Sequence, residues 1–437
     1  MPLNTVRIRR RARRMALWNG VLWAIGNGLA GSTLVIYLTR ELHAERLGLY
    51  VSLILAAPQV AGLLQLAAPA MIGRLADRRR FCLGAFSTSA LALLAWPCVC
   101  SPDWLLSPGG ALAALIVLWC MHHVAHSLGM VALWSWLADM APTRIRGRFL
   151  GWRQRWTVGG GAVAAVAAGL FVWRLPKTFS ALPSWMPYGI LTAVGAAFML
   201  AALWPLARMP ALARRSPAPP RRAVRLLLKP LTDTRFLRLL LYGCWFSFWN
   251  GITNSAQRVF TVAVLELDLL TSLTLETGTR LGQWAISPRV GRLADRLGNR
   301  PVMIASQLLV AAGLLCYAVA TPAGWLWAAV AAALWVAYAG LNVCLPSLTL
   351  RLSPRELNTT YVATFDGVRG LFYAASTVLG GLLVDSGHRW FGCDRLAMLP
   401  ILFVFGWAVR SLGAVLLLLI IEPPATERRS DERPPGR

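Results

Sequence analysis

Acidic residues are scarce in this chain. Only 18 of its 437 residues are Asp or Glu, against 44 Lys and Arg, and all charged residues together make up 14%. Hydrophobic residues account for 57%. Ordinary soluble domains carry about 25% charged residues. The composition therefore excludes a soluble globular protein and indicates a chain that lies in lipid.

The sequence also lacks motifs for enzymatic chemistry. Its eight cysteines form no Cys-x-x-Cys pair, the spacing that many zinc and redox sites use. No Walker loop for ATP is present, and little of the chain lies outside its apolar runs. We therefore expect no enzyme, no bound cofactor and no metal site. Whether any of Cys98, Cys100 and Cys393 form a disulfide stays open at this stage.

Long apolar runs fill most of the chain. A run of about 20 residues is long enough to cross the hydrocarbon core of a bilayer, and in lipid its backbone must form a helix. The runs lack the alternating pattern of a membrane β-strand. The sequence predicts an all-α membrane protein with twelve transmembrane helices. The predicted spans are 15–38, 48–72, 82–101, 110–137, 151–172, 185–207, 236–264, 269–290, 302–321, 325–345, 362–384 and 396–421.

The formal net charge of +26 follows the predicted spans. Arginines crowd the N-terminus, the connections after even-numbered spans, the segment 208–235 and the C-terminal tail, and few lie elsewhere. Because Lys and Arg resist translocation, the crowded side is cytoplasmic. We expect a multi-pass protein of the cell (inner) membrane, with both termini in the cytoplasm. The arginines would meet membrane lipids rather than nucleic acid, and we expect a monomer.

One charged string occurs twice, which indicates a duplicated chain. GRLADR lies at Gly73–Arg78 and at Gly291–Arg296, 218 residues apart, and each copy follows an apolar run. Further matched pairs are Asn27-Gly28 with Asn250-Gly251, and Gln65 with Gln283. Repeats of this kind place a substrate site near the middle of the bilayer, between the two halves.

The duplication predicts four parts of the chain. They are an N-terminal six-helix half at 1–207, a linker at 208–235, a C-terminal six-helix half at 236–421 and a cytoplasmic tail at 422–437. The linker is rich in Arg and Pro, as expected for a flexible cytoplasmic segment that lets the halves rock.

The repeated string resembles the signature between the second and third helices of each half in major facilitator superfamily (MFS) carriers. The resemblance implies two six-helix halves and a loop that latches one helix pair against another, opening as the carrier changes access. The residues that would take this gating role are Gly73, Asp77, Arg78, Gly291, Asp295 and Arg296. A basic loop that only sets topology is the alternative, although topology alone does not require an acid in both copies.

Ionisable residues inside spans are functional candidates, because they are unfavourable in lipid unless they face a cavity or a partner. Glu276 and Arg280 are four residues apart in the eighth span and share a helix face. Asp366 and Arg369 are three apart in the eleventh. Glu276 is the first candidate for a proton-coupling acid, with Arg280 favouring its charged form, and Asp366 is the second. A permanent structural pair of Glu276 with Arg280 is the alternative.

Further polar residues lie in spans that would border a central cavity. The candidates for substrate contact are Asn27, Gln65, His122, His126, Asn250, Asn254, Arg258 and Gln283. Hydrogen bonds between helices are an equally ordinary use for the amides, and packing within the bundle is the commoner use for the histidines. Arg410, in the twelfth span, has no evident partner.

Together these features predict a secondary active transporter for a small organic solute. It would work by alternating access and be coupled to protons. Two alternatives remain. One is a lipid or lipophile flippase or exporter on the same fold, and the other is a membrane receptor or assembly factor that has lost transport.

Overall fold

The computed structural model describes residues 3–31, 37, 47–64, 77–100, 108–140, 143–178, 182–210, 229–354, 357–392 and 397–420. No strand occurs among these residues. In the N-terminal half the helices are α1 (Leu3–Ala30), α3 (Leu47–Leu63), α5 (Arg78–Leu94), α6 (Pro97–Cys100), α7 (Pro108–Met140), α8 (Thr143–Thr178), α9 (Met186–Ala201) and α10 (Leu203–Ala207). In the C-terminal half they are η2 (Lys229–Thr232), α12 (Thr234–Ala263), α13 (Leu269–Leu297), α14 (Asn299–Val319), α15 (Leu326–Leu334), η3 (Trp335–Ala337), α16 (Tyr338–Leu352), α17 (Asn358–Phe391) and α18 (Met398–Leu418).

Each of the twelve predicted spans overlaps one helix or consecutive helices within its described residues, which confirms the predicted fold class. Among the described residues, eight helical segments are long and apolar enough to cross a membrane, and α3 is a shorter apolar helix. The three remaining spans are α1, α12 and α13, each of which includes charged residues. The predicted linker lies largely in 211–228, outside the described residues.

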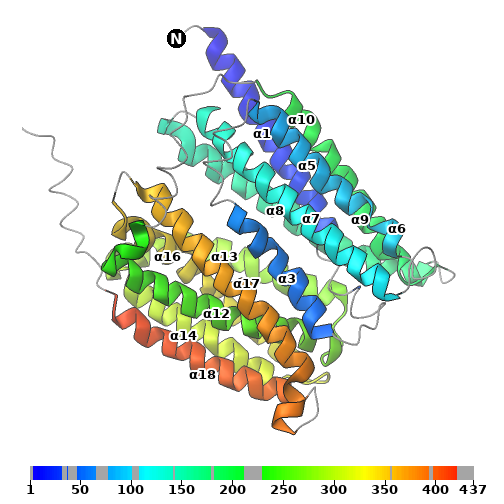
Figure 1. The fold of residues 1–437 in the computed structure, drawn as a ribbon, viewed down its shortest axis with the longest axis vertical. Coiled ribbons are helices and arrows are strands. Elements are labelled where there is room, and N and C mark those ends of the chain that lie inside the picture. Colours follow the sequence, from blue (N-terminus) through cyan, green and yellow to red (C-terminus); the bar gives the residue numbers. More distant parts are fainter. Residues whose placement is uncertain are drawn as a thin grey trace, which may run out of the picture.

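The helices form two bundles (Figure 1). In the first, α1 packs against α8 and α9, and in the second α12 packs in the same way against α17 and α18. The matched Asn-Gly pairs serve equivalent contacts. A Cβ on Gly28 would lie 2.5 Å from the carbonyl oxygen of Gly161 in α8, and one on Gly251 would lie 2.6 Å from that of Tyr373 in α17. The duplication is therefore visible in how the helices pack.

In the described part of the chain the halves meet chiefly through α3 with α17 and through α8 with α13, and α3 also contacts α12. We call the end of the assembly that holds the start of α1 and the end of α18 the terminal end (upper left in Figure 1), and the opposite one the far end. At the far end, the Asp385 carboxylate of α17 accepts hydrogen bonds from Gly48 N at 2.9 Å and Leu49 N at 2.7 Å, in the first turn of α3. A Cβ on Gly169 of α8 would lie 2.9 Å from the Leu270 Cα of α13. These contacts close the far end.

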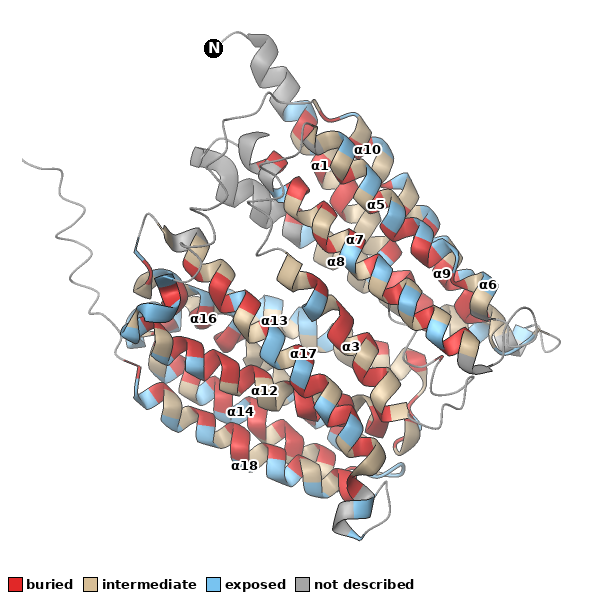
Figure 2. Cartoon of the chain, viewed as in Figure 1, coloured by how far each residue is buried: buried red, intermediate tan, exposed pale blue. Residues whose placement is uncertain are grey.

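Helix α13 differs from its neighbours in burial. Buried residues follow the inside of each bundle (Figure 2), but along the 29 residues of α13 only Leu269, Leu273 and Ala294 are buried. Glu276 and Arg280 lie on this helix, and ionisable residues are unfavourable against lipid unless they face a partner or a cavity. We therefore expect the exposed face of α13 to line the space between the halves.

The eighth span ends later than predicted. Helix α13 continues to Leu297 rather than to 290, so the second GRLADR string forms its last turns and is not a loop. Charged residues do not interrupt a helix that leaves the membrane. Gly298 does, because its φ of 91° is a conformation that only glycine adopts readily.

Candidate functional site

Glu276 lies between two arginines near the far-end half of α13. Its Oε2 is 3.3 Å from Arg258 Nη1 and its Oε1 is 2.5 Å from Arg280 Nη2. Asp268 begins α13 by accepting a hydrogen bond from Thr271 N, and the helix then places residues 276 and 280 on one face. The predicted pair is present, and Arg258 from α12 adds a contact that sequence spacing does not reveal.

The same region of α13 is bound to the tenth span through polar side chains. Thr279 Oγ1 donates to the Ala332 carbonyl at 3.1 Å, and Gln283 Nε2 donates to that of Trp335 at 3.1 Å. Asn342 Nδ2 of α16 approaches Gln283 Oε1 at 3.4 Å. Gln283, predicted as a cavity residue, therefore links the region of Glu276 to that of Asn342.

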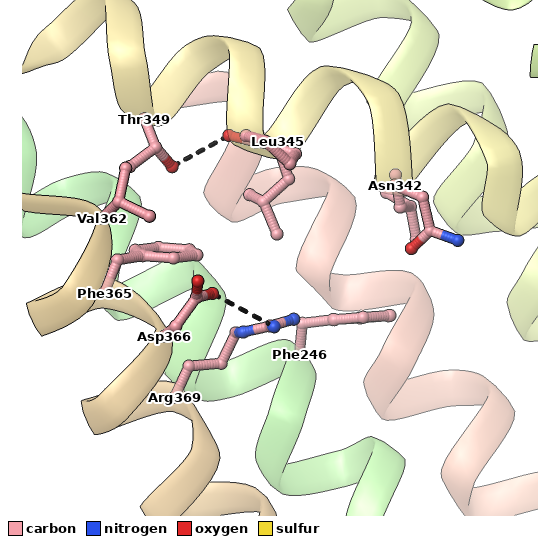
Figure 3. Close-up of a pocket in the computed structure, with 10 residues that line it drawn as sticks. Phe246, Asn342, Leu345, Thr349, Val362, Phe365, Asp366 and Arg369 are labelled. Atoms are coloured by element: carbon pink, nitrogen blue, oxygen red, sulfur yellow. Dashed lines mark hydrogen bonds and ion pairs between the residues drawn. The ribbon is translucent and has the colours of Figure 1, made fainter. Parts of the chain in front are cut away.

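A pocket of about 110 Å³ lies in the C-terminal half (Figure 3). Its lining comes from α12, α16 and α17 and consists of Phe246, Leu341, Asn342, Leu345, Pro346, Thr349, Val362, Phe365, Asp366 and Arg369. Asp366 and Arg369 supply its only charged groups, with Arg369 Nη2 at 3.4 Å from Asp366 Oδ1. The Asp366 side chain is 60% exposed, and Arg369 Nε has no hydrogen-bond partner among the described residues.

Arg410 is fully buried and faces the bundle. Its Nη2 donates to Asn250 Oδ1 at 2.7 Å and also to the Thr253 hydroxyl, and its Nη1 lies 3.5 Å from the Tyr338 hydroxyl. Gln307 Nε2 donates to the Arg410 carbonyl at 2.8 Å. These contacts could not be predicted from the sequence, because every side-chain partner is neutral and lies on another helix.

The two asparagines of α12 bond to neighbouring helices. Asn250 Oδ1 accepts from the Tyr338 hydroxyl at 3.0 Å as well as from Arg410, and Asn254 Nδ2 donates to the Tyr373 hydroxyl at 2.6 Å. Asn27 in α1 is exposed. The amides of α12 thus have the helix-to-helix bonds that the sequence left as one alternative.

The predicted histidines lie inside the N-terminal half. The buried His122 Nδ1 is 2.8 Å from Ser89 Oγ of α5, and the His126 ring stacks on Trp23 of α1 with centroids 5.2 Å apart. No cluster of three metal-ligating side chains occurs in the described ranges. This arrangement favours packing over substrate contact for both residues.

The predicted gating residues differ between the two strings. Asp77 caps α5 by accepting hydrogen bonds from Arg79 N at 2.9 Å and Arg80 N at 3.3 Å. In the second string Gly291, Asp295 and Arg296 lie within α13, and the last two are exposed. Gly73 and Gln65 lie outside the described residues, as does the side chain of Arg78. The prediction of a loop is wrong for the second copy, and the latching role stays a prediction.

Of the three cysteines left open above, Cys98 is free and exposed. Cys393 and the side chain of Cys100 lie outside the described residues.

Comparison with known proteins identifies the fold. Residues 260–437 match the family model described as Major Facilitator Superfamily. The crystal structure of the nucleoside transporter NupG is similar with a TM-score of 0.69 at 10% identity, covering 95% of this chain and 100% of that one. A D-xylose-proton symporter is similar with a TM-score of 0.69 at 16% identity, and the match covers 96% of this chain and 98% of that one. A bacterial homologue of the human lysosomal transporter Spinster is similar with a TM-score of 0.62 at 14% identity, and the match covers 96% of each chain. No curated protein matches the sequence.

Proposed function

Because this chain has the fold of the Major Facilitator Superfamily, and its residues 260–437 match that family, we propose that it is a secondary active transporter. It carries a small organic solute across a membrane by alternating access. The similar solved structures include a nucleoside transporter and a D-xylose-proton symporter. Transport assays should therefore begin with solutes of the size of sugars and nucleosides.

One observation carries the mechanism. The halves meet at the far end through α3 with α17 and through α13 with α8, while the pocket is lined by the first part of α17, which lies towards the terminal end (Figure 1). The two pairs are equivalent under the repeat, so both must separate when the halves rock. Since the arginine-rich terminal end would face the cytoplasm, this conformation is inward-facing.

For proton coupling, Asp366 becomes the first candidate and Glu276 the second, which reverses the order from sequence. A proton on Glu276 would weaken its attraction to two guanidinium groups, whereas Asp366 has one arginine at 3.4 Å and lies in the pocket. Release and uptake of a proton are easier for the carboxylate with fewer charged partners. The contacts of Glu276 with two arginines support a role in which this carboxylate stays charged throughout transport.

Transport into proteoliposomes, with and without a proton gradient, tests the proposal. Asp366→Asn should abolish proton-driven accumulation and leave solute exchange at zero gradient intact, because the amide carries no titratable proton. The control is Glu266→Gln, an exposed residue in the connection between α12 and α13. Accumulation that persists in Asp366→Asn but disappears in Glu276→Gln would assign coupling to Glu276. Wild-type protein that moves no solute in either direction would contradict the transport function itself.

A further inference from the structure

The described helices of the C-terminal half hold more arginine around Glu276 than this acid balances. One carboxylate, Glu276, lies between the two guanidinium groups of Arg258 and Arg280. Arg410 bonds to no carboxylate in the part of the chain that the structure describes. A structural ion pair needs one arginine for each acid. A purely structural role for Glu276 therefore does not explain why a second arginine contacts it.

The surplus charge lies where a solute can reach it. The side chain of Arg280 is 67% exposed and that of Arg258 is 41% exposed. Trp284, one turn after Arg280 on the same face of α13, lies under the Arg155 guanidinium of α8, with 5.5 Å from Cζ to the ring centroid. Because Arg155 belongs to the N-terminal half, this face of α13 borders the space between the halves.

A row of polar residues on α12 extends the site. Asn250, Asn254 and Arg258 are spaced by four residues and share one helix face. Asn250 Oδ1 accepts hydrogen bonds from both Arg410 and Tyr338, which fixes the orientation of the amide. Since Oδ1 faces Arg410, the two N–H donors of Nδ2 are directed away from that arginine.

We infer that the solute is an organic anion whose carboxylate or phosphate group binds Arg258 and Arg280 in competition with Glu276. This inference rests on the proposed transport function. Guanidinium groups bind planar oxyanions through paired hydrogen bonds, and a bound anion would neutralise the surplus charge inside the membrane. The Asn250 amide offers donors to a further oxygen of the same solute.

Thermal stabilisation of the purified full-length protein tests the charge of the solute. The probes form matched sets: gluconate and glucose 6-phosphate against glucose, and benzoate against benzamide. At least one anion should raise the melting temperature while its neutral match does not. Gluconate or benzoate alone would indicate a carboxylate, and glucose 6-phosphate alone a phosphate ester. Stabilisation by the neutral compounds equal to that by the anions, or by none of the five, overturns the inference.

Three variants give a pattern that a structural role would not produce. Arg258→Gln and Arg280→Gln should weaken binding of the active anion by about tenfold or more, as for loss of a charged hydrogen bond. Glu276→Gln should strengthen it, because it removes the competing carboxylate. The control is Arg238→Gln, on α12 but at the terminal end, where Arg238 approaches the Leu419 carbonyl. If Arg258→Gln does not fold, the exposed Arg280 supplies the measurement.

Glu276→Gln that weakens binding as the arginine variants do would overturn the inference and indicate a structural cluster. Failure of the inference and failure of the transport function are separable. Liposomes that accumulate only neutral probes would support transport and contradict the anion. An anion that binds in the expected pattern and never crosses the membrane would support the site and contradict transport.

Discussion

Arg410 shows how one residue can be kept charged inside a membrane helix without an acid beside it. Neutral oxygens of Asn250, Thr253 and Tyr338 receive its Nη protons, while its Nε has no partner among the described residues. Buried cations are unfavourable unless fully bonded. The arrangement is therefore incompletely satisfied, and it is open to improvement by an added negative charge.

We expect Asn250→Asp to stabilise the protein without solute. The aspartate keeps the oxygen that Arg410 and Tyr338 contact and adds a charge opposite Arg410. Each kcal/mol gained should raise the melting temperature by about 1 °C in a chain of this length. The measurement is thermal unfolding in detergent, with Asn254→Asp as the matched control, since Asn254 bonds to Tyr373 and not to an arginine. Equal loss of stability in both variants would contradict the prediction.

Contacts between side chains were predictable from sequence only where they follow from spacing along one helix. Glu276 with Arg280, and Asp366 with Arg369, are pairs of that kind, and both are present. The Arg258 contact and the partners of Arg410 are set by how separate helices pack, which one sequence does not specify. Partners that are neutral leave no charge pattern to read.

At the scale of elements, the first turn of α3 depends on a helix of the other half. The N–H groups that begin a helix have no partner within it. Asp385 of α17 accepts those of Gly48 and Leu49, whereas Asp233 caps α12 within its own half by accepting those of Arg235 and Phe236. The two caps thus differ in whether they survive separation of the halves.

Asp385→Ala should favour opening of the far end, because the lost cap, about 0.5–2 kcal/mol, stabilises only the closed state. Maleimide labelling of a cysteine at the buried Ser52, on a background without the native cysteines, measures the opening and should become faster. Asp233→Ala should lower the melting temperature and leave labelling unchanged. Equal labelling rates in both variants would show that Asp385 is not specific to the closed state.

Helices were predictable as elements, and their ends less so. Apolar length located all twelve spans, but the end of the eighth was placed at 290, directly before the GRLADR string that begins at Gly291. Charge marks where a helix leaves lipid, whereas Gly298 marks where α13 ends. The breaks within the third, sixth and tenth spans were not predicted either.

For the whole molecule, the close approach of α3 and α17 controls the balance between conformations. A Cβ on Gly381 would lie 2.2 Å from the Gly48 carbonyl oxygen, too close to be accommodated without a shift of backbone. The same addition at Gly84 in α5 meets nothing within 4 Å. A methyl group added at Gly381 therefore disturbs the contact between the halves, whereas one added at Gly84 disturbs no contact.

Gly381→Ala should shift the protein towards opening at the far end by about tenfold, taking overpacking to cost the closed state about 1.4 kcal/mol. Hydrogen–deuterium exchange measures this at the Gly48 and Leu49 amides, which bond to Asp385 in the closed state. Gly84→Ala should exchange as the wild type does. Unchanged exchange in Gly381→Ala would mean that the two helices do not limit opening.

The division into two repeated halves was predictable because duplicated residues leave a visible offset in the sequence. Matched positions such as Gly28 and Gly251 then took equivalent contacts. The position of α3 against α17 was not predictable, since a repeat shows which helices correspond and does not show which ones meet across the halves.

The placement of α3 also has a consequence for synthesis of the chain. Helix α3 makes its most extensive contacts with α17 (Figure 1), and the Gly48–Asp385 bond spans 337 residues. At about 5–20 residues per second, the ribosome needs roughly 17–67 s to make the intervening chain. During that interval α3 is already made while its main partner does not exist. The protein reaches its closed far end only after the eleventh span is inserted, so a nascent chain cut short before α17 leaves α3 unpaired.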